Sequence, residues 1–425
     1  TEIYTLSLHD ALPISEEAEE LVKAGIPFEV VPGVTSAVAA PAYAGIPVTH
    51  RDHASMVTFV TGHENPDKEH SSIDWANLAG SRGSLVFLMG IKNLATITSS
   101  LIANGMSPDT PAALVRWGTT PDQSSFLSCL GNIADECVAR KFKAPAVLIV
   151  GSVASLKPTL DWYENKPLFG KRVLITRSKE QSKKMADRVL SQAGKPVLFP
   201  TIQIKEPHDF SELDEAISSA GSFDWIIFTS VNGVEGFFKR FFETGLDIRD
   251  LAGPKFGAIG PITAKAIQNR GIKVELLGDQ FVAEGVLEAL DEQDIQGKTF
   301  LIPRAEKARE ILPEGIQKRG GSVKLVTVYR TELPDEADVI SVKDSLGHRD
   351  IDVITFTSSS TVSHFVELVG KQDLQGLLKD VVIASIGPIT SATIREFGLE
   401  PSLEASEYTI DGLMTAIESH FCSQR

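Results

Sequence analysis

Side chains able to hold an anion recur at the ends of apolar runs in the second part of this 425-residue chain. Arg177 and Arg304 each follow such a run, Thr229 and Ser230 follow another, and Ser358 follows a fourth. An arginine offers parallel donors to a carboxylate, and hydroxyls beside a helix start cap the helix or donate to an anion. The pattern indicates a compact ligand with several negative charges. No histidine, cysteine or carboxylate pair recurs with it, so it suggests neither a metal nor a covalent nucleophile.

Two Gly-Pro turns carry related chemistry. The segments AIGPITA at 258–264 and SIGPITS at 385–391 place a proline at the first position of a helix, where its missing N–H is harmless. Thr263 and Thr390 then lie in a first turn whose amides attract carboxylates or phosphates. Tyr329, near the end of the run VTVYRT, is a candidate proton donor. The alternatives stay open: plain caps and turns, surface ion pairs for the arginines, and core packing for the tyrosine.

A long-period repeat explains why these residues occur in pairs. LITRSKE at 174–180 recurs as LIPRAEK at 301–307, and AIGPITA recurs as SIGPITS, both at an offset of 127 residues. FDWIIFTSVNGVEGF at 223–237 recurs as IDVITFTSSSTVSHF at 351–365, at an offset of 128. Each block has the pattern of a strand, a turn and a helix. The sequence therefore predicts two copies of one α/β unit, with ligand groups at the carboxyl ends of the strands.

The first part of the chain also alternates between apolar runs and helical patterns, which is typical of α/β domains. Thr35 and Ser36 follow one run, Met89 another and Gly118 a third. Small residues at such turns let the backbone approach a ligand, although ordinary turns are the simpler interpretation. A polar stretch at 157–167 predicts a linker. The expected strands cover 28–31, 57–60, 85–88, 112–115 and 146–150, and the expected helices cover 36–44, 93–104 and 133–140.

Composition excludes several classes of protein. A formal charge of −15 disfavours nucleic acid and anionic membranes as partners. Three scattered cysteines suit neither a disulfide framework nor a zinc cage, and no apolar run reaches the roughly 20 residues of a membrane span. Motifs of P-loop nucleotidases, Rossmann dehydrogenases, zinc proteases and esterases are absent from the sequence. With no signal-peptide pattern, we expect a cytoplasmic protein.

Residues 168–425 resemble uroporphyrinogen-III synthase through DWIIFTSVNGV, AIGPITA, LIPRAEKAREILPEGI, VTVYRT, DVITFTSSSTV and ASIGPIT. The resemblance implies two similar α/β lobes, one from 168–203 plus 336–425 and the other from 205–330. It also implies a cofactor-free reaction in which hydroxymethylbilane loses water, inverts its last ring and closes to uroporphyrinogen III. Tyr329 aligns with a tyrosine that assists the leaving hydroxyl. The residues expected to bind substrate are Thr229, Ser230, Thr263, Ser358, Thr390, Arg177 and Arg304.

Residues 16–156 resemble the C-terminal part of the α/β domain of uroporphyrinogen-III C-methyltransferase, a tetrapyrrole methyltransferase. The motifs are VPGVTSA, AGIPVTHRD, VTFVTGH, LVFLMGI, ALVRWGTTPDQ and PAVLIVGSV. The resemblance implies S-adenosyl-L-methionine as cofactor, with Thr35, Ser36, Met89 and Gly118 at cofactor-contact positions. It also implies a homodimer formed through this part, and a place in siroheme or cobalamin biosynthesis.

The family's first strand and glycine-rich turn should precede Glu16, and residues 1–15 do not match them. We interpret 1–15 as either a foreign leader or a native tail. We therefore expect no useful methyl transfer from this chain alone, and expect it in a full-length parent. Two alternatives to the synthase interpretation stay open: a non-catalytic, two-lobed protein that binds a small anion, and a working methyltransferase.

Overall fold

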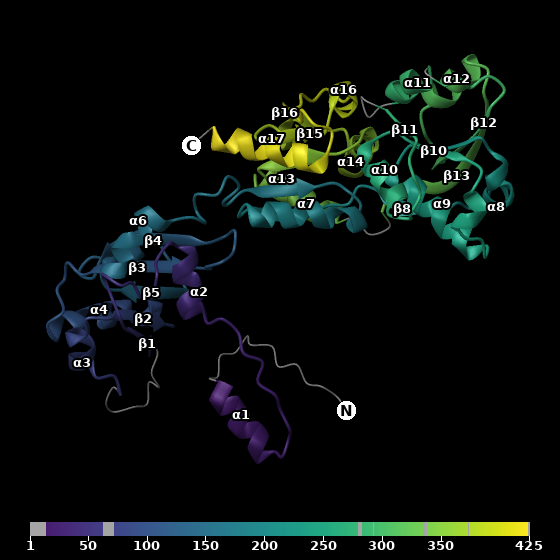
Figure 1. The fold of residues 1–425 in the computed structure, drawn as a ribbon. Coiled ribbons are helices and arrows are strands. Elements are labelled where there is room, and N and C mark those ends of the chain that lie inside the picture. The colour runs from purple at the N-terminus through teal and green to yellow at the C-terminus, as the bar shows by residue number, and fades with distance from the viewer. Residues whose placement is uncertain are drawn as a thin grey trace. The chain divides into compact units, whose positions relative to one another are not determined.

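The computed structural model describes residues 14–62, 72–278, 283–291, 293–334, 338–372 and 374–423 (Figure 1). The chain divides into two compact units, Thr1–Glu164 and Asn165–Arg425. Within the described ranges, no helix is long and apolar enough to cross a bilayer. Residues 1–13 of the unmatched leader lie outside the described residues.

A five-stranded sheet with the order β1-β2-β5-β3-β4 forms the centre of the first unit. Strands β1 and β2 are parallel, and the other neighbours are antiparallel. Leu85, Phe87 and Leu114 pack with residues of α4 and α5, whereas Val86 and Ile149 pack with α2. Burial on both faces explains why the central strands are continuous apolar runs.

The strands of the first unit are β1 (Val57–Thr61), β2 (Ser84–Leu88), β3 (Pro111–Arg116), β4 (Ser124–Cys129) and β5 (Ala146–Val150). Its α-helices are α1 (Ile14–Lys23), α2 (Ser36–Tyr43), α3 (Trp75–Gly80), α4 (Leu94–Ala103), α5 (Ile133–Ala139) and α6 (Lys157–Leu160). Two 3-10 helices, η1 (Ile91–Asn93) and η2 (Ser152–Leu156), complete it.

Three expectations for the first unit differ from the structure. The strand expected at 28–31 is wrong: Val30 and Val31 are 58% and 87% exposed, and no strand among the described residues pairs with this segment. A β-branched run does not form a strand without a partner. Edge strand β4 was not expected, because only Phe126 of its six residues is buried. The stretch expected to be a linker contains α6, and Lys157 there is buried.

The second unit contains two sheets that share one topology. One has the order β16-β15-β14-β6-β7, and the other has the order β11-β10-β9-β12-β13-β8. All neighbours are parallel except β8, which pairs antiparallel with the end of β13. The repeat maps β6 onto β12, β7 onto β13, β14 onto β9, β15 onto β10 and β16 onto β11, at offsets of 127 or 128 between first residues. The predicted duplication of an α/β unit is therefore confirmed.

The five-stranded sheet consists of β6 (Arg172–Ile175), β7 (Lys195–Leu198), β14 (Val353–Phe356), β15 (Val382–Ser385) and β16 (Leu403–Glu404). The six-stranded sheet consists of β8 (Gln203–Lys205), β9 (Trp225–Phe228), β10 (Lys255–Ala258), β11 (Leu276–Leu277), β12 (Thr299–Ala305) and β13 (Ser322–Glu332). Helices pack on both faces of each sheet and bury four apolar clusters. The fold is thus the α/β architecture predicted from the sequence.

The helices that accompany the five-stranded sheet are α7 (Lys179–Ser191), α13 (Val339–Gly347), α14 (Ser359–Val369), α15 (Leu374–Leu377), α16 (Pro388–Glu396) and α17 (Ile410–Cys422). Those that accompany the six-stranded sheet are α8 (Ser211–Ser218), α9 (Val231–Glu243), α10 (Pro261–Gln268), α11 (Ala283–Asp291) and α12 (Ile311–Lys318), with η3 (Ala220–Ser222) and η4 (Ile248–Leu251).

Candidate functional site

Four helices of the second unit begin at the carboxyl ends of parallel strands. After β9, Ser230 caps α9, and its hydroxyl accepts a hydrogen bond from the amide of Gly233 at 3.0 Å. After β14, Ser358 caps α14 and accepts from the amide of Thr361 at 3.3 Å. Helices α10 and α16 begin with the prolines of the two Gly-Pro turns. Each helix start presents backbone N–H groups and partial positive charge, as the repeat predicts.

The two first-turn threonines behave alike. Thr263 on α10 and Thr390 on α16 are buried, at 7% and 4% exposure. Thr390 lines a cavity together with Ser358, whereas Thr263 is absent from the lining of the cavities described below. The structure thus brings Thr390 to a polar surface and leaves Thr263 among the packed residues of its helix.

Tyr329 lies near the end of β13, with its hydroxyl 3.2 Å from the Ser230 hydroxyl. Its ring packs against the apolar core of the six-stranded sheet, which confirms core packing for the ring, whereas the role of its hydroxyl as a proton donor stays a prediction. Burial raises the pKa of the phenol, and the polar side chains of Ser230 and Asn232 oppose this effect. The hydroxyl is therefore protonated at neutral pH and can donate.

The two repeat-equivalent arginines have different partners. Arg304 donates to the carboxylate of Glu310 at 2.6 Å, which is the ion pair left open by the sequence. Arg177 donates to a neutral group, the amide oxygen of Gln181, at 2.7 Å. No carboxylate among the described side chains forms an ion pair with Arg177, and burial lowers the pKa of its guanidinium. A desolvated cation with only an amide partner favours an incoming anion.

Two neighbouring cavities open at these strand ends. One, of about 250 Å³, is lined by Thr229 and Arg304, and the other, of about 380 Å³, by Ser358 and Thr390. Arg309 lines both cavities, as does Ile389. Arg309 comes from the half of the unit that holds the six-stranded sheet, and Ile389 from the other half. The two cavities thus adjoin within the second unit, and their mostly apolar walls carry a few hydroxyl and guanidinium groups.

Sequence reasoning missed several residues of this surface. Arg309 belongs to the motif LIPRAEKAREILPEGI but was not selected as a candidate, and it lies in an exposed loop before α12. Gln181 and Asn232 donate and accept across the two halves at 2.7 Å. Asn232 follows the Thr-Ser pair by two positions, and its repeat equivalent Ser360 is also polar. That shared polarity was the available signal for Asn232, whereas only the fold could place Gln181.

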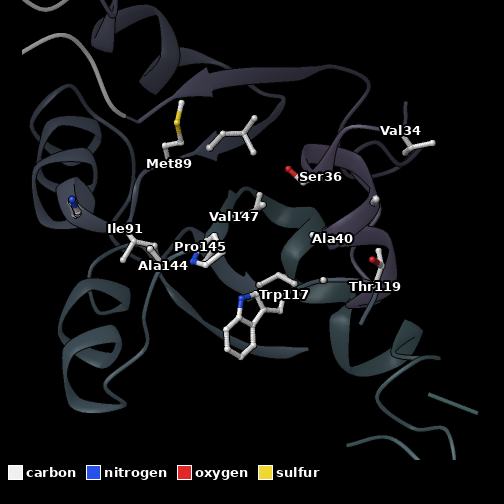
Figure 2. A pocket seen from close by; sticks show the side chains of 16 residues that line it. Val34, Ser36, Ala40, Met89, Ile91, Trp117, Thr119, Ala144, Pro145 and Val147 are labelled. Atoms are coloured by element: carbon white, nitrogen blue, oxygen red, sulfur yellow. The ribbon is translucent and has the colours of Figure 1, made fainter. Parts of the chain in front are cut away.

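The first unit holds its own cavity, of about 690 Å³, with mostly apolar walls. Ser36 contributes from α2, Met89 from the turn after β2, and Gly118 and Thr119 from the turn after β3. Figure 2 shows Ser36, Met89 and Trp117 around this space. Thr35 lies next to it and caps α2 through a bond from the amide of Ala37. Ser36, Met89 and Gly118 therefore come together as expected, and Thr35 has a structural role.

The backbone around this cavity is unusual. Met89, Trp117 and Thr119 have φ angles of 56°, 48° and 74°, in the left-handed region that side chains rarely adopt. Gly118 packs against α2, where an added Cβ would lie 2.4 Å from the Cβ of Ala40. A glycine is thus required for the helix to approach the turn. The cavity can take a flat aromatic group between apolar walls, with hydroxyls at its edge.

Comparison with protein families gave two matches. The model described as "Uroporphyrinogen-III synthase HemD" matches residues 183–415, and the model described as "Tetrapyrrole (Corrin/Porphyrin) Methylases" matches residues 12–134. The methylase match ends before Glu164 and the synthase match starts after it, so the two matches follow the division into two units. Together they account for most of the described chain.

Three curated proteins illustrate the similarity. "Porphyrin biosynthesis protein HemD" of Ruminiclostridium josui is 34% identical over 403 residues, which cover 94% of this chain and 78% of that protein. "Uroporphyrinogen-III synthase" of Synechococcus elongatus is 33% identical over 60% of this chain and 96% of its own length. The "S-adenosyl-L-methionine-dependent uroporphyrinogen III methyltransferase" of Methanosarcina barkeri is 54% identical over 34% of this chain and 57% of its length. The chain thus spans only about half of the methyltransferase that it matches.

Proposed function

We propose a reaction for the second unit from one premise: the chain belongs to the uroporphyrinogen-III synthase family, and a tetrapyrrole methyltransferase domain precedes its synthase domain. The reaction is the cyclisation of hydroxymethylbilane to uroporphyrinogen III, with loss of water and inversion of the last ring. The observation that carries this proposal is the half-buried Tyr329 hydroxyl, 3.2 Å from the Ser230 hydroxyl that caps α9.

Positioning comes first in the proposed mechanism. Hydroxymethylbilane carries eight carboxylates, and the strand-end surface offers cations, hydroxyls and free amides to them. Arg177 is the strongest candidate for one carboxylate because its described partner is a neutral amide. Ser358 and Thr390 would contact others from their shared cavity, and Arg304 and Thr229 from the adjoining one. Holding a flexible chain in a bent conformation contributes much of the rate.

Proton donation follows. Tyr329, or a water that it orders, donates its proton to the departing hydroxyl, and the carbon–oxygen bond breaks as electrons move in from the pyrrole nitrogen. Water leaves and an azafulvene remains. The substituted carbon of the last ring attacks this electrophile, and the resulting spiro intermediate rearranges to the inverted macrocycle. The proton released when the ring regains aromaticity restores the phenol, so the step balances without a cofactor.

The product isomer tests this proposal. Enzymatically generated hydroxymethylbilane is incubated with the full chain, and uroporphyrinogens I and III are resolved by chromatography. The synthase proposal requires type III. Formation of type I at the uncatalysed rate, together with binding of the bilane, would instead support the alternative of a non-catalytic protein that binds a polyanion.

For the first unit we propose S-adenosyl-L-methionine as ligand. The apolar walls and the hydroxyl of Ser36 fit an adenosine group, and Met89 and Gly118 border the same space. When bound, the cofactor supplies an activated methyl group for transfer to a tetrapyrrole carbon. Val34 lines this cavity and is 80% exposed, so the space is open on that side. We therefore propose that this chain alone transfers methyl groups poorly, and micromolar binding in a calorimetric titration would contradict that.

Three broader features complete the proposal. We place the domains at 16–156 and 168–425, with the synthase lobes at 168–203 plus 336–425 and at 205–330. We propose a cytoplasmic enzyme that supplies siroheme or cobalamin synthesis. Exposed apolar residues of the first unit, including Met56 and Phe59, support a homodimer through that unit. Light scattering of the purified chain tests the dimer, and a concentration-independent monomer would exclude it.

A further inference from the structure

Apolar side chains line the cavity of about 380 Å³ in the second unit, and the proposed mechanism leaves them without a role. Tyr408 and Ile389 are large residues of its wall, and they are 43% and 37% exposed. Hydroxyls and a guanidinium are sufficient to bind carboxylates, whereas the negative face of an aromatic ring disfavours them. These two side chains therefore indicate a ligand that also has a flat, apolar part.

The ring of Tyr408 lies directly against the backbone of Gly387. A Cβ atom placed on Gly387 would lie 2.9 Å from Cδ1, 3.3 Å from Cγ and 3.4 Å from Cε1 of the tyrosine. The φ angle of Gly387 is 171°, which is extended backbone that any residue adopts. The tyrosine ring, and not the backbone conformation, thus fills the space that a side chain would take at position 387. The exposed part of the ring borders the cavity.

The loop that carries Tyr408 is fixed on both sides of the ring. On the N-terminal side, the amide of Ala405 donates to the carbonyl of Ser385 at 3.0 Å. The hydroxyl of Ser385 donates to the carbonyl of Gly387 at 3.0 Å, which holds the turn against which the ring lies. On the C-terminal side, Thr409 caps α17. A ring that is already held in place loses little side-chain entropy when a ligand stacks on it.

Polar groups lie around the same cavity. The hydroxyls of Ser358 and Ser360 are 2.9 Å apart, and Arg309 contributes a guanidinium from the half that holds the six-stranded sheet. An apolar wall with cationic and hydroxyl groups beside it is complementary to a flat ring that has carboxylate arms. Hydroxymethylbilane has this composition, because its four pyrrole rings carry its eight carboxylates.

We propose that Tyr408 and Ile389 form the binding site for one pyrrole ring of hydroxymethylbilane, and that this pyrrole stacks on the phenol ring. The carboxylate arms of that pyrrole then extend to Arg309 and to the Ser358 hydroxyl. This inference rests on the proposed function and deepens it, since it assigns the apolar part of the substrate to named side chains. Tyr408 binds and orients the pyrrole, whereas proton donation remains with Tyr329.

Tyr408→Leu removes the aromatic ring and keeps an apolar side chain. An aromatic pair contributes about 1 kcal/mol beyond the area that it buries, so we expect KM for hydroxymethylbilane to rise roughly fivefold, with kcat changed less than twofold. Tyr408→Phe keeps the ring, so its KM should lie well below that of Tyr408→Leu. Phe242→Leu is the matched control and should keep the wild-type KM, because Phe242 is 45% exposed and lies at the C-terminal end of α9.

A variant of Gly387 displaces the ring without altering it. In Gly387→Ala the new Cβ would lie 2.9 Å from Cδ1 of Tyr408, so the ring must move and KM should rise. In the double variant Gly387→Ala/Tyr408→Leu, the loss of binding free energy should be smaller than the sum of the two single losses, because both changes act on one contact. Additive losses, or equal KM values for Tyr408→Leu and Tyr408→Phe, would overturn the inference.

An NMR titration of the full chain is independent of turnover. With ring-labelled tyrosine, the resonance lost in Tyr408→Phe identifies Tyr408 among the five tyrosines. Uroporphyrinogen III, added anaerobically, should shift that resonance upfield through the ring current of the stacked pyrrole, whereas citrate, a carboxylate ligand without rings, should not. An unshifted resonance at saturating uroporphyrinogen III, or an equal shift with citrate, contradicts the inference. If the expected shift is present and the wild type forms no type III product, only the proposed function is contradicted.

Discussion

Replacing Arg177 with methionine should separate substrate binding from stability. The guanidinium is the cation of the strand-end surface that, among the described side chains, has an amide partner and no carboxylate. A charge-assisted hydrogen bond to a substrate carboxylate contributes about 1.5–3 kcal/mol. At 1.4 kcal/mol per factor of ten, its loss raises KM for hydroxymethylbilane roughly 10- to 100-fold. We expect kcat to fall less, because Tyr329 remains in place.

The same substitution should leave the folded state as stable as the wild type or more so. Arg177 is half-buried, and this burial lowers its pKa and disfavours its charged form; full burial of an ion costs several kcal/mol, and partial burial costs a fraction of that. The hydrogen bond to Gln181 stabilises the folded state by only about 1 kcal/mol. Methionine keeps the volume of the stem and removes the charge. We therefore expect the free energy of unfolding to rise by about 1 kcal/mol.

The assay compares Arg177→Met with Arg188→Met, which lies on α7, the helix that follows Arg177. Arg188 makes two hydrogen bonds to Glu418, at 2.7 and 2.9 Å, so its loss should lower stability and leave KM unchanged. Steady-state kinetics and urea unfolding are measured on both variants. If Arg177→Met were less stable than the wild type and its KM stayed within twofold, Arg177 would have a structural role, and its assignment to substrate binding would be wrong.

Three further predictions concern other parts of the chain. In Tyr329→Phe, kcat should fall roughly 10- to 100-fold. Because burial raises the Tyr329 pKa above 10, wild-type turnover should decline only as pH rises through that higher value, and the pH–rate profile of the variant should lack this decline. Lys157→Met leaves the carboxylates of Asp161 and Glu164 facing each other, so calorimetry should show the first unit losing about 2–3 kcal/mol; an unchanged transition would contradict this. Gly118→Ala should displace α2 and weaken S-adenosyl-L-methionine binding at least tenfold, whereas unchanged titration would show that the turn can yield.

The fold of the second unit was predictable because a duplication encodes it twice. Each motif fixes a strand, a turn and a helix, and the constant offset fixes their order in both copies. Parallel strands that are buried on both faces have continuous apolar sequences, so their positions are easily recognised in the sequence. The same reasoning located Ser230 and Ser358, because a hydroxyl between a strand and a helix is well placed to cap the helix.

Features that depend on which groups meet in the folded chain were not predictable. The run at 28–31 has the composition of a strand. Whether a strand forms depends on a neighbouring strand to pair with, and composition does not reveal such a partner. The partners of Arg177 and Arg304 are equally invisible in the motifs, which treat the two as equivalent. Lys157 looked like part of a polar linker until the fold placed Asp161 and Glu164 against its ammonium group.

The group we propose as proton donor lies where the two copies differ. At the repeat offset of 127 residues, Tyr329 corresponds to Ile202. The positions that match in both copies are helix caps and first turns, which hold anions by backbone geometry and need no particular chemistry. A duplicated fold thus supplies equivalent anion-binding helix starts in both copies, which suit a ligand with carboxylates along its length. A reaction that inverts one ring of four requires an acid on one side only, and divergence of a single copy at the position of Tyr329 would be sufficient to provide it.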